Sequence, residues 1–86
     1  MVRIVGLLEK IRIIKRSPMM ARFTVTTIQK SYNCIVATPE LVTVILMLVE
    51  GKYNVAVSGH FNKQKQLVVE DFTIRNPDQA AKDLGL

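Results

Sequence analysis

Cationic and aromatic side chains are the residues of this sequence whose types could do chemistry, and that chemistry is the binding of a polyanion. Lysine and arginine neutralise phosphate groups, and aromatic rings stack on unpaired bases. The alternative is a solvated cationic face that only keeps the protein soluble. We expect the binding surface to comprise Lys10, Arg12, Arg22, Lys30, Tyr32, Phe61, Lys63 and Lys65.

The positive charge is concentrated in the first part of the chain. The 86 residues include 12 Lys or Arg and 7 Asp or Glu, for a net charge of +5. Residues 1–35 carry seven Lys or Arg against one acidic residue, a net +6, whereas the remainder carries five against six, a net −1. A local patch of this kind attracts phosphate groups by an electrostatic interaction that is insensitive to base sequence.

The sequence offers no arrangement of residues for catalysis or metal binding. Cys34 is the single cysteine, which excludes an internal disulfide, and we interpret it as a small core residue. His60 is the single histidine, so no second imidazole can share a metal with it. Glu70 and Asp71 are neighbours on a predicted strand and therefore point to opposite faces. We expect no enzyme activity, no cofactor and no metal site.

Composition indicates a soluble, cytoplasmic domain. Hydrophobic residues make up 49% of the chain, enough for a packed core. The segment "MVRIVGLLEK" at the N-terminus lacks the apolar stretch of a signal peptide. The longest apolar segment, residues 41–49, is much shorter than the roughly 20 residues that span a bilayer. The sequence therefore predicts no contact with a membrane.

Runs of alternating apolar and polar residues predict five strands that would position the binding residues. Gly6 interrupts the first run, and we predict a bulge or bend there that lets one strand serve two sheets. We expect residues 62–66, which contain two lysines, to form a flexible hairpin loop. The predicted strands cover residues 2–16, 22–28, 32–36, 53–61 and 67–75.

The aromatic residues divide into core and surface candidates. Phe23, Tyr53 and Phe72 alternate in phase with aliphatic neighbours, which favours core packing. Tyr32 begins a strand beside a lysine, and Phe61 lies next to the cationic loop. These two rings are therefore the ones we expect to stack on bases.

Residues 38–51 are predicted to form a helix, although several β-branched residues favour a strand there. Thr38 can cap the helix, Pro39 suits its first turn, and Gly51 can end it. Leu46 and Met47 would be partly exposed, covering either a subunit contact or the edge of the core. The apolar face would contain Leu41, Val42, Val44, Ile45, Leu48 and Val49.

A second, short helix is predicted at the end of the chain, over residues 76–86. Asn76 can cap it, Pro77 suits its start, and Gly85 can end it. The predicted organisation is therefore one domain, residues 1–75, followed by a C-terminal helix or tail, residues 76–86.

The order of three strands, a helix and two strands predicts a mostly all-β fold, a five-stranded Greek-key barrel of the oligonucleotide-binding (OB) class. "VRIVGLL" at residues 2–8, "ARFTV" at 21–25 and "VAVSG" at 55–59 resemble the bacterial single-stranded DNA-binding protein family and its relative, primosomal replication protein N. The resemblance spans residues 2–75. The chain departs from the family in having no Trp and no long tail with an acidic tip.

This resemblance implies sequence-tolerant binding of single-stranded DNA in replication, repair or recombination, with RNA as an alternative ligand. It also implies a homodimer or homotetramer. The loss of tryptophan implies that affinity rests more on charge. The alternative function is an assembly module of a replication or conjugation complex, which would dock through the apolar helix or a free strand edge.

Overall fold

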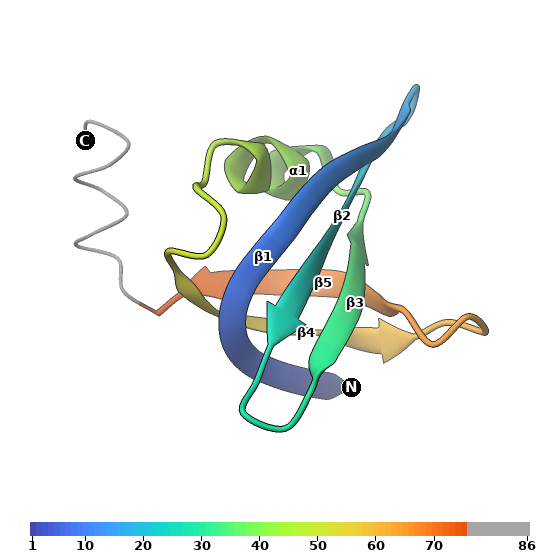
Figure 1. Cartoon of the computed structure of the whole chain (residues 1–86). Helices are drawn as coiled ribbons and strands as arrows, with labels where there is room; N and C mark the ends of the chain where they lie inside the picture. The colour runs from blue at the N-terminus through green and yellow to red at the C-terminus, as the bar shows by residue number, and fades with distance from the viewer. Residues whose placement is uncertain (76–86) are drawn as a thin grey trace.

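The computed structural model describes residues 1–75 and contains five strands that close into a barrel (Figure 1). This confirms the predicted five-stranded barrel with one helix between the third and fourth strands. The helix predicted over residues 76–86 lies outside the described residues. The elements are β1 (Val2–Arg16), β2 (Met19–Thr26), β3 (Ser31–Val36), α1 (Pro39–Leu46), β4 (Asn54–Phe61) and β5 (Leu67–Ile74).

The barrel closes because β1 is long enough to pair with two neighbours. Its residues Val2 to Leu7 pair with β4, and its residues from Leu7 to Arg16 pair with β2. The order around the barrel is β1, β2, β3, β5, β4. All these pairs are antiparallel except β3 with β5, which is parallel and joins Cys34 and Ile35 to the start of β5.

Gly6 lies where β1 changes partner, as predicted, but the bulge is elsewhere. A Cβ atom at Gly6 would lie 2.5 Å from the carbonyl oxygen of Thr26, so a side chain would not fit. The pairing with β4 is nevertheless regular through Gly6. The pairing with β2 has two irregularities, one between Glu9 and Arg12, where Lys10 has a φ of 54°, and one between Ile13 and Lys15. Of the two predicted alternatives, a bulge or a bend at Gly6, the bulge is therefore wrong.

The interior is filled by aliphatic side chains and two aromatic rings. Phe23 and Tyr53 are completely buried, and Phe72 is partly buried against the core. The rings of Phe23 and Phe72 meet edge to face, with centroids 6.1 Å apart. The prediction that these three aromatic residues pack in the core is confirmed. Cys34 is also completely buried, as expected of a core residue.

Helix α1 ends earlier than predicted. It occupies only Pro39–Leu46, because the next amides donate to carbonyls three residues back: Met47 to Val44 and Leu48 to Ile45. Thr38 precedes the helix in an extended conformation, without a side-chain capping bond. The predicted stop, Gly51, does have a positive φ of 74°, but its amide donates to the Leu8 carbonyl of β1. It closes a loop against the barrel rather than ending the helix.

The burial of apolar residues differs in part from the predicted apolar face. Val42, Ile45 and Leu48 are in the core as predicted, whereas Val44 and Val49 are exposed, contrary to the predicted apolar face. Leu46 and Met47 are exposed as expected. Within residues 1–75, no helix is long and apolar enough to cross a membrane.

Candidate nucleic-acid interface

A bulge in β1 brings two cations to the outer face of the barrel. Between Glu9 and Arg12 the extra residue breaks the ladder, and the carbonyl of Glu9 accepts a hydrogen bond from the Thr24 hydroxyl at 3.2 Å. Bulges redirect the side chains around them. Lys10 and Arg12 both line the surface that β1 shares with β2 and β3.

The cationic depression is the first part of the candidate site, with a volume of about 330 Å³. Arg12 pairs with Arg22 across β1 and β2, and Thr24 pairs with Asn33 across β2 and β3. These cross-strand neighbours bring side chains from three strands together. The depression is lined by Lys10, Arg12, Arg22, Thr24 and Asn33.

The aromatic depression is the second part, with a volume of about 400 Å³. Tyr32 at the start of β3 and Phe61 at the end of β4 have ring centroids 6.4 Å apart and planes tilted by 36°. Phe61 is 42% exposed, and Tyr32 is partly buried. The depression is lined by Lys30, Ser31, Tyr32, Asn33, Phe61 and Lys65.

A hydroxyl-centred turn fixes the position of Lys30. The side-chain oxygen of Thr27 accepts hydrogen bonds from the amides of Gln29 at 3.2 Å and Lys30 at 3.1 Å. Serine and threonine favour such turns because the hydroxyl can bond to the following backbone. The ammonium group of Lys30 consequently lies 4.6 Å from the ring centroid of Tyr32, a cation–π contact.

The β4–β5 connection is held by the side chain of Asn62. Its Oδ1 accepts hydrogen bonds from the amides of Gln64 and Gln66, both at 3.0 Å, and its Nδ2 donates to Gln66 Oε1 at 3.1 Å. The prediction of a flexible loop overlooked this asparagine-centred turn. The turn places Lys65, with a φ of 62°, at the aromatic depression, whereas Lys63 lines neither depression.

One cation of the site already has an acidic partner. Arg12 Nη1 lies 2.8 Å from Glu50 Oε1, and both side chains are exposed. Such an exposed pair contributes only about 0 to 1 kcal/mol to stability. The pair also affects binding, since a phosphate group must compete with Glu50 for the same guanidinium.

Asn33 joins the two depressions, because it lines both. Seven of the eight predicted site residues therefore lie along one connected surface, and Lys63 is the exception. Sequence reasoning did not select Thr24, Ser31 or Asn33. Two of them could have been found from the alternation of residues along β3. This alternation places Ser31 and Asn33 on the face opposite the buried Cys34.

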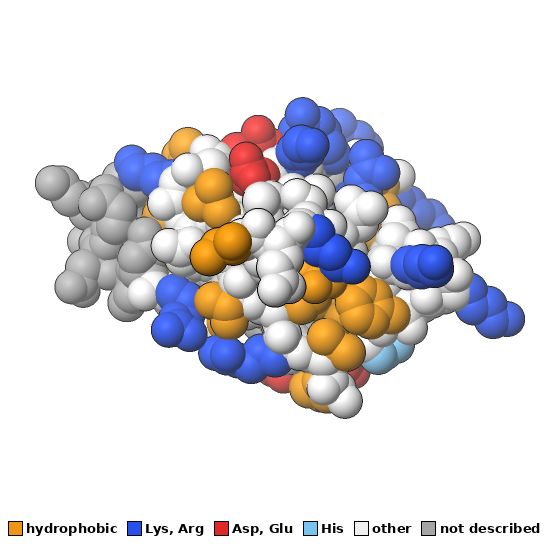
Figure 2. Space-filling view, turned by 60° about the horizontal axis from the view of Figure 1, so that its bottom comes forward, with side chains coloured by type: hydrophobic (Ala, Val, Ile, Leu, Met, Phe, Trp, Pro, Cys, Tyr) orange, Lys and Arg blue, Asp and Glu red, His pale blue; other side chains and the backbone are white. Residues whose placement is uncertain are grey.

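On the face of the molecule shown in Figure 2, the distribution of charged side chains is uneven. Lys and Arg side chains gather along the upper and right-hand parts of this face, with exposed hydrophobic side chains between them, and a smaller group lies at the lower left (Figure 2). The cations are therefore concentrated without being confined to one patch.

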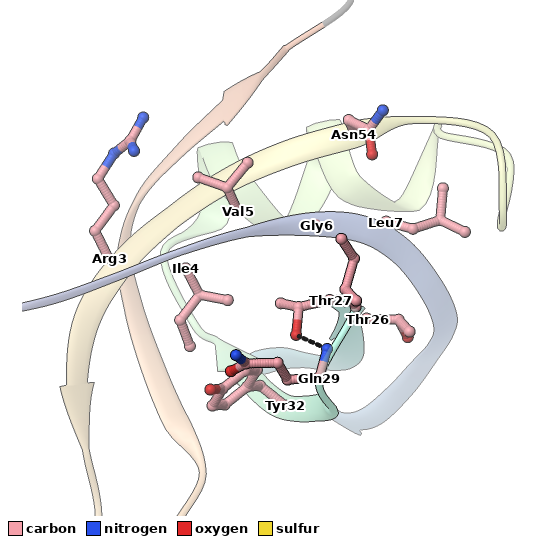
Figure 3. A pocket seen from close by; sticks show the side chains of 11 residues that line it. Arg3, Ile4, Val5, Gly6, Leu7, Thr26, Thr27, Gln29, Tyr32 and Asn54 are labelled. Carbon is pink, nitrogen blue, oxygen red and sulfur yellow. Dashed lines mark hydrogen bonds between the residues drawn. The ribbon is translucent and has the colours of Figure 1, made fainter.

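A third depression, of about 630 Å³, lies between β1 and the β2–β3 connection (Figure 3). Ile4 of β1 lies on one side, and Gln29 and Tyr32 lie on the other (Figure 3). Tyr32 also belongs to the aromatic depression, so the two are neighbours. We refer to this one as the β1 depression. Apart from Arg3 it is lined by uncharged residues.

The described residues contain no cluster suited to a metal ion. No group of three or more His, Cys, Asp and Glu side chains comes together within residues 1–75. Burial raises the pKa of the Cys34 thiol to about 12, from an ordinary value of 9.0, which keeps it protonated at neutral pH. A neutral buried thiol is a poor nucleophile.

Neither a family model nor a characterised protein matches this chain at the level of sequence. Solved structures do match. The mitochondrial single-stranded DNA-binding protein Rim1 of S. cerevisiae superposes with a TM-score of 0.70 over 85% of this chain and 90% of its own, at 15% identity. The Plasmodium falciparum SSB in complex with ssDNA gives a TM-score of 0.64, covering 85% and 91%, also at 15% identity. The chain therefore has the OB fold of these proteins.

Proposed function

We propose that this protein binds single-stranded nucleic acid, DNA in the first place, with little dependence on base sequence. The observation that carries the proposal is the continuity of the cationic and aromatic depressions through Asn33. A single strand presents phosphates and unpaired bases side by side, and this surface offers partners for both. The fold shared with two proteins described as single-stranded DNA-binding supports the same conclusion.

Each part of the surface has a separate role in the proposal. Lys10, Arg12 and Arg22 contact phosphates in the cationic depression, and Lys30 and Lys65 contact them beside the rings. Tyr32 and Phe61 provide stacking faces, which any base can use because every base has a π face. Lys63, on the same loop as Lys65, is proposed as an outer phosphate contact.

Fluorescence anisotropy with labelled oligo(dT) and oligo(rU) across a range of salt concentrations tests the proposal. If the five cations that line the two depressions engage phosphates, the slope of log K against log salt is roughly −3.5, from about −0.7 for each phosphate of a single strand. A slope near zero, or no binding at low salt, would refute the proposal. An assembly module that docks only to proteins would give that result.

Two charge-reversal variants distinguish binding at the proposed site from attraction by the overall charge of the protein. Arg22→Glu, in the cationic depression, should weaken binding to all oligonucleotides alike. Arg75→Glu makes the same change in net charge at an exposed residue that lines none of the three depressions. An equal loss of affinity in the two variants would contradict the assignment of the cationic depression as part of the binding site.

The finer assignments rest on the sequence motifs of residues 2–8, 21–25 and 55–59. They support a relation to bacterial single-stranded DNA-binding proteins and primosomal replication protein N, and a cytoplasmic role in replication, repair or recombination. We propose a binding protein and not an enzyme, with residues 1–75 as its binding domain.

We also propose that the protein forms a homodimer or homotetramer through the first part of β1. Residues Val2 to Gly6 pair with β4 on one side, and within residues 1–75 no strand pairs with them on the other. Val2 and Val5 are exposed there, and the β1 depression adjoins. Such an edge can pair with a second copy. Light scattering at two protein concentrations tests this, and a monomer at both would refute it.

A further inference from the structure

The hairpin formed by β1 and β2 extends beyond the body of the barrel (Figure 1). Residues 13–20 make up this extension, which we call the arm. Lys15 pairs with Met20, and Arg16 pairs with Met19, so the arm is a two-stranded antiparallel ribbon. No residue of the arm lines any of the three depressions. The arm therefore lies outside the three depressions.

The surface of the arm is both cationic and apolar. Lys15 and Arg16 are exposed near its tip. Ile13, Ile14 and Met19 are 41%, 44% and 39% exposed. The sequence has no Asp or Glu between Lys10 and Glu40, so nothing on the arm offsets its positive charge. A ribbon with this composition is suited to an anionic partner that also offers apolar surface.

We propose that the arm binds duplex DNA immediately beside the single strand held in the cationic and aromatic depressions. The protein would then recognise a junction between single-stranded and duplex DNA. This inference rests on the proposed function. At the base of the arm, Arg12 and Arg22 are paired in register and line the cationic depression. A strand leaving that depression at this end therefore meets the arm directly.

The dimensions of the arm favour the major groove. Two paired strands lie about 4.8 Å apart, and with their side chains they form a ribbon roughly 10 to 12 Å wide. The major groove of B-DNA is about 12 Å wide and admits such a ribbon, whereas the minor groove, at about 6 Å, does not. Lys15 and Arg16 contact phosphates, and the exposed isoleucines contact thymine methyl groups or the face of the last base pair.

The test uses the full chain and three labelled DNA probes. The first is oligo(dT) of about 6 nucleotides, within the roughly 4 to 16 nucleotides that one OB fold binds and short enough to stay within the two depressions. The second is the same oligo(dT) as a tail on a duplex of about 12 base pairs, just over one helical turn. The third is the blunt duplex. Anisotropy gives Kd for each probe, and its salt dependence gives the number of phosphates engaged.

The wild-type protein should bind the tailed duplex roughly tenfold more tightly than oligo(dT) alone. The salt slope should be steeper by about 2, because two further cations engage duplex phosphates at about 0.9 each. Lys15→Glu and Arg16→Glu should each remove most of this gain and leave oligo(dT) binding within about twofold. The matched control, Arg75→Glu, should affect the tailed duplex and oligo(dT) equally. Thermal melting confirms that the variants are folded.

Two results would overturn the inference. Equal affinity of the wild-type protein for oligo(dT) and the tailed duplex would refute it alone and would favour an acidic protein as the partner of the arm. If Arg16→Glu weakened the binding of oligo(dT) and of the tailed duplex by the same factor, the arm would be part of the single-strand site and not a separate duplex site. Failure to bind oligo(dT) at all would instead refute the proposed function, and the junction with it.

Discussion

Replacement of Phe61 by alanine should weaken single-strand binding without changing its salt dependence. A ring that stacks on one base contributes about 1 to 3 kcal/mol, which corresponds to a Kd increase of roughly 5- to 150-fold. The change removes no charge, so the number of phosphates engaged is the same. Phe61 is the cleaner of the two candidate rings, because Tyr32 also packs against the core.

The stability cost of this substitution can be estimated from burial. Complete burial of a phenylalanine side chain contributes about 1.5 to 3 kcal/mol. Phe61 is 42% exposed, so its loss should cost about 1 to 2 kcal/mol of unfolding free energy. Urea denaturation measures this cost independently of binding. A folded variant with weaker binding separates the two effects.

Two controls refine the experiment on Phe61. Phe61→Tyr keeps the ring and should keep most of the affinity. Met47→Ala removes a comparably exposed apolar side chain after helix α1, away from the three depressions, and should leave Kd unchanged. Fluorescence anisotropy with oligo(dT) at several salt concentrations measures both Kd and its salt dependence. An unchanged Kd for Phe61→Ala, or a shallower salt slope, would refute the stacking role.

Three further predictions concern the electrostatics of the site and the stability of the barrel. Glu50→Gln should tighten oligo(dT) binding about two- to fivefold by releasing Arg12, and this gain should vanish in an Arg12→Met background. Gly59→Ala should lower the free energy of unfolding, measured by urea denaturation, by about 3 kcal/mol or more, because its Cβ would collide with a carbonyl of β5. Gly51→Ala meets no neighbour and should cost about 1 to 2 kcal/mol through its positive φ alone. Burial raises the pKa of Cys34 from 9.0 to about 12. The contribution of the protonated thiol to the free energy of unfolding should therefore be complete below pH 9 and fall as pH rises toward 12. Urea unfolding at a series of pH values should show a smaller fall in stability for Cys34→Ala than for the wild-type protein.

Strands such as β2 could be predicted from the sequence because apolar and polar residues alternate in them with a period of two. Phe23 and Val25, for example, point inward, whereas Arg22 points outward. The residues that begin or end each strand differ by up to three positions from the prediction. Alternation depends only on neighbouring residues, so it can be read from the sequence.

The bulge at Lys10 and the early end of α1 could not be predicted, because both depend on contacts between distant residues. Lys10 is not a residue type that favours a positive φ, and the Thr24 hydroxyl that satisfies the Glu9 carbonyl comes from another strand. In the same way, Gly51 bonds to the Leu8 carbonyl only once the barrel has formed. The residues of the site were selected by type, and their juxtaposition required the register of three strands.

The most direct test of the account is an NMR titration of the labelled protein with oligo(dT). Chemical-shift changes should concentrate on Lys10, Arg22, Tyr32, Asn33 and Phe61, which line the two depressions joined by Asn33. Changes confined to α1 or to the first residues of β1, with these five residues unaffected, would contradict the proposed interface.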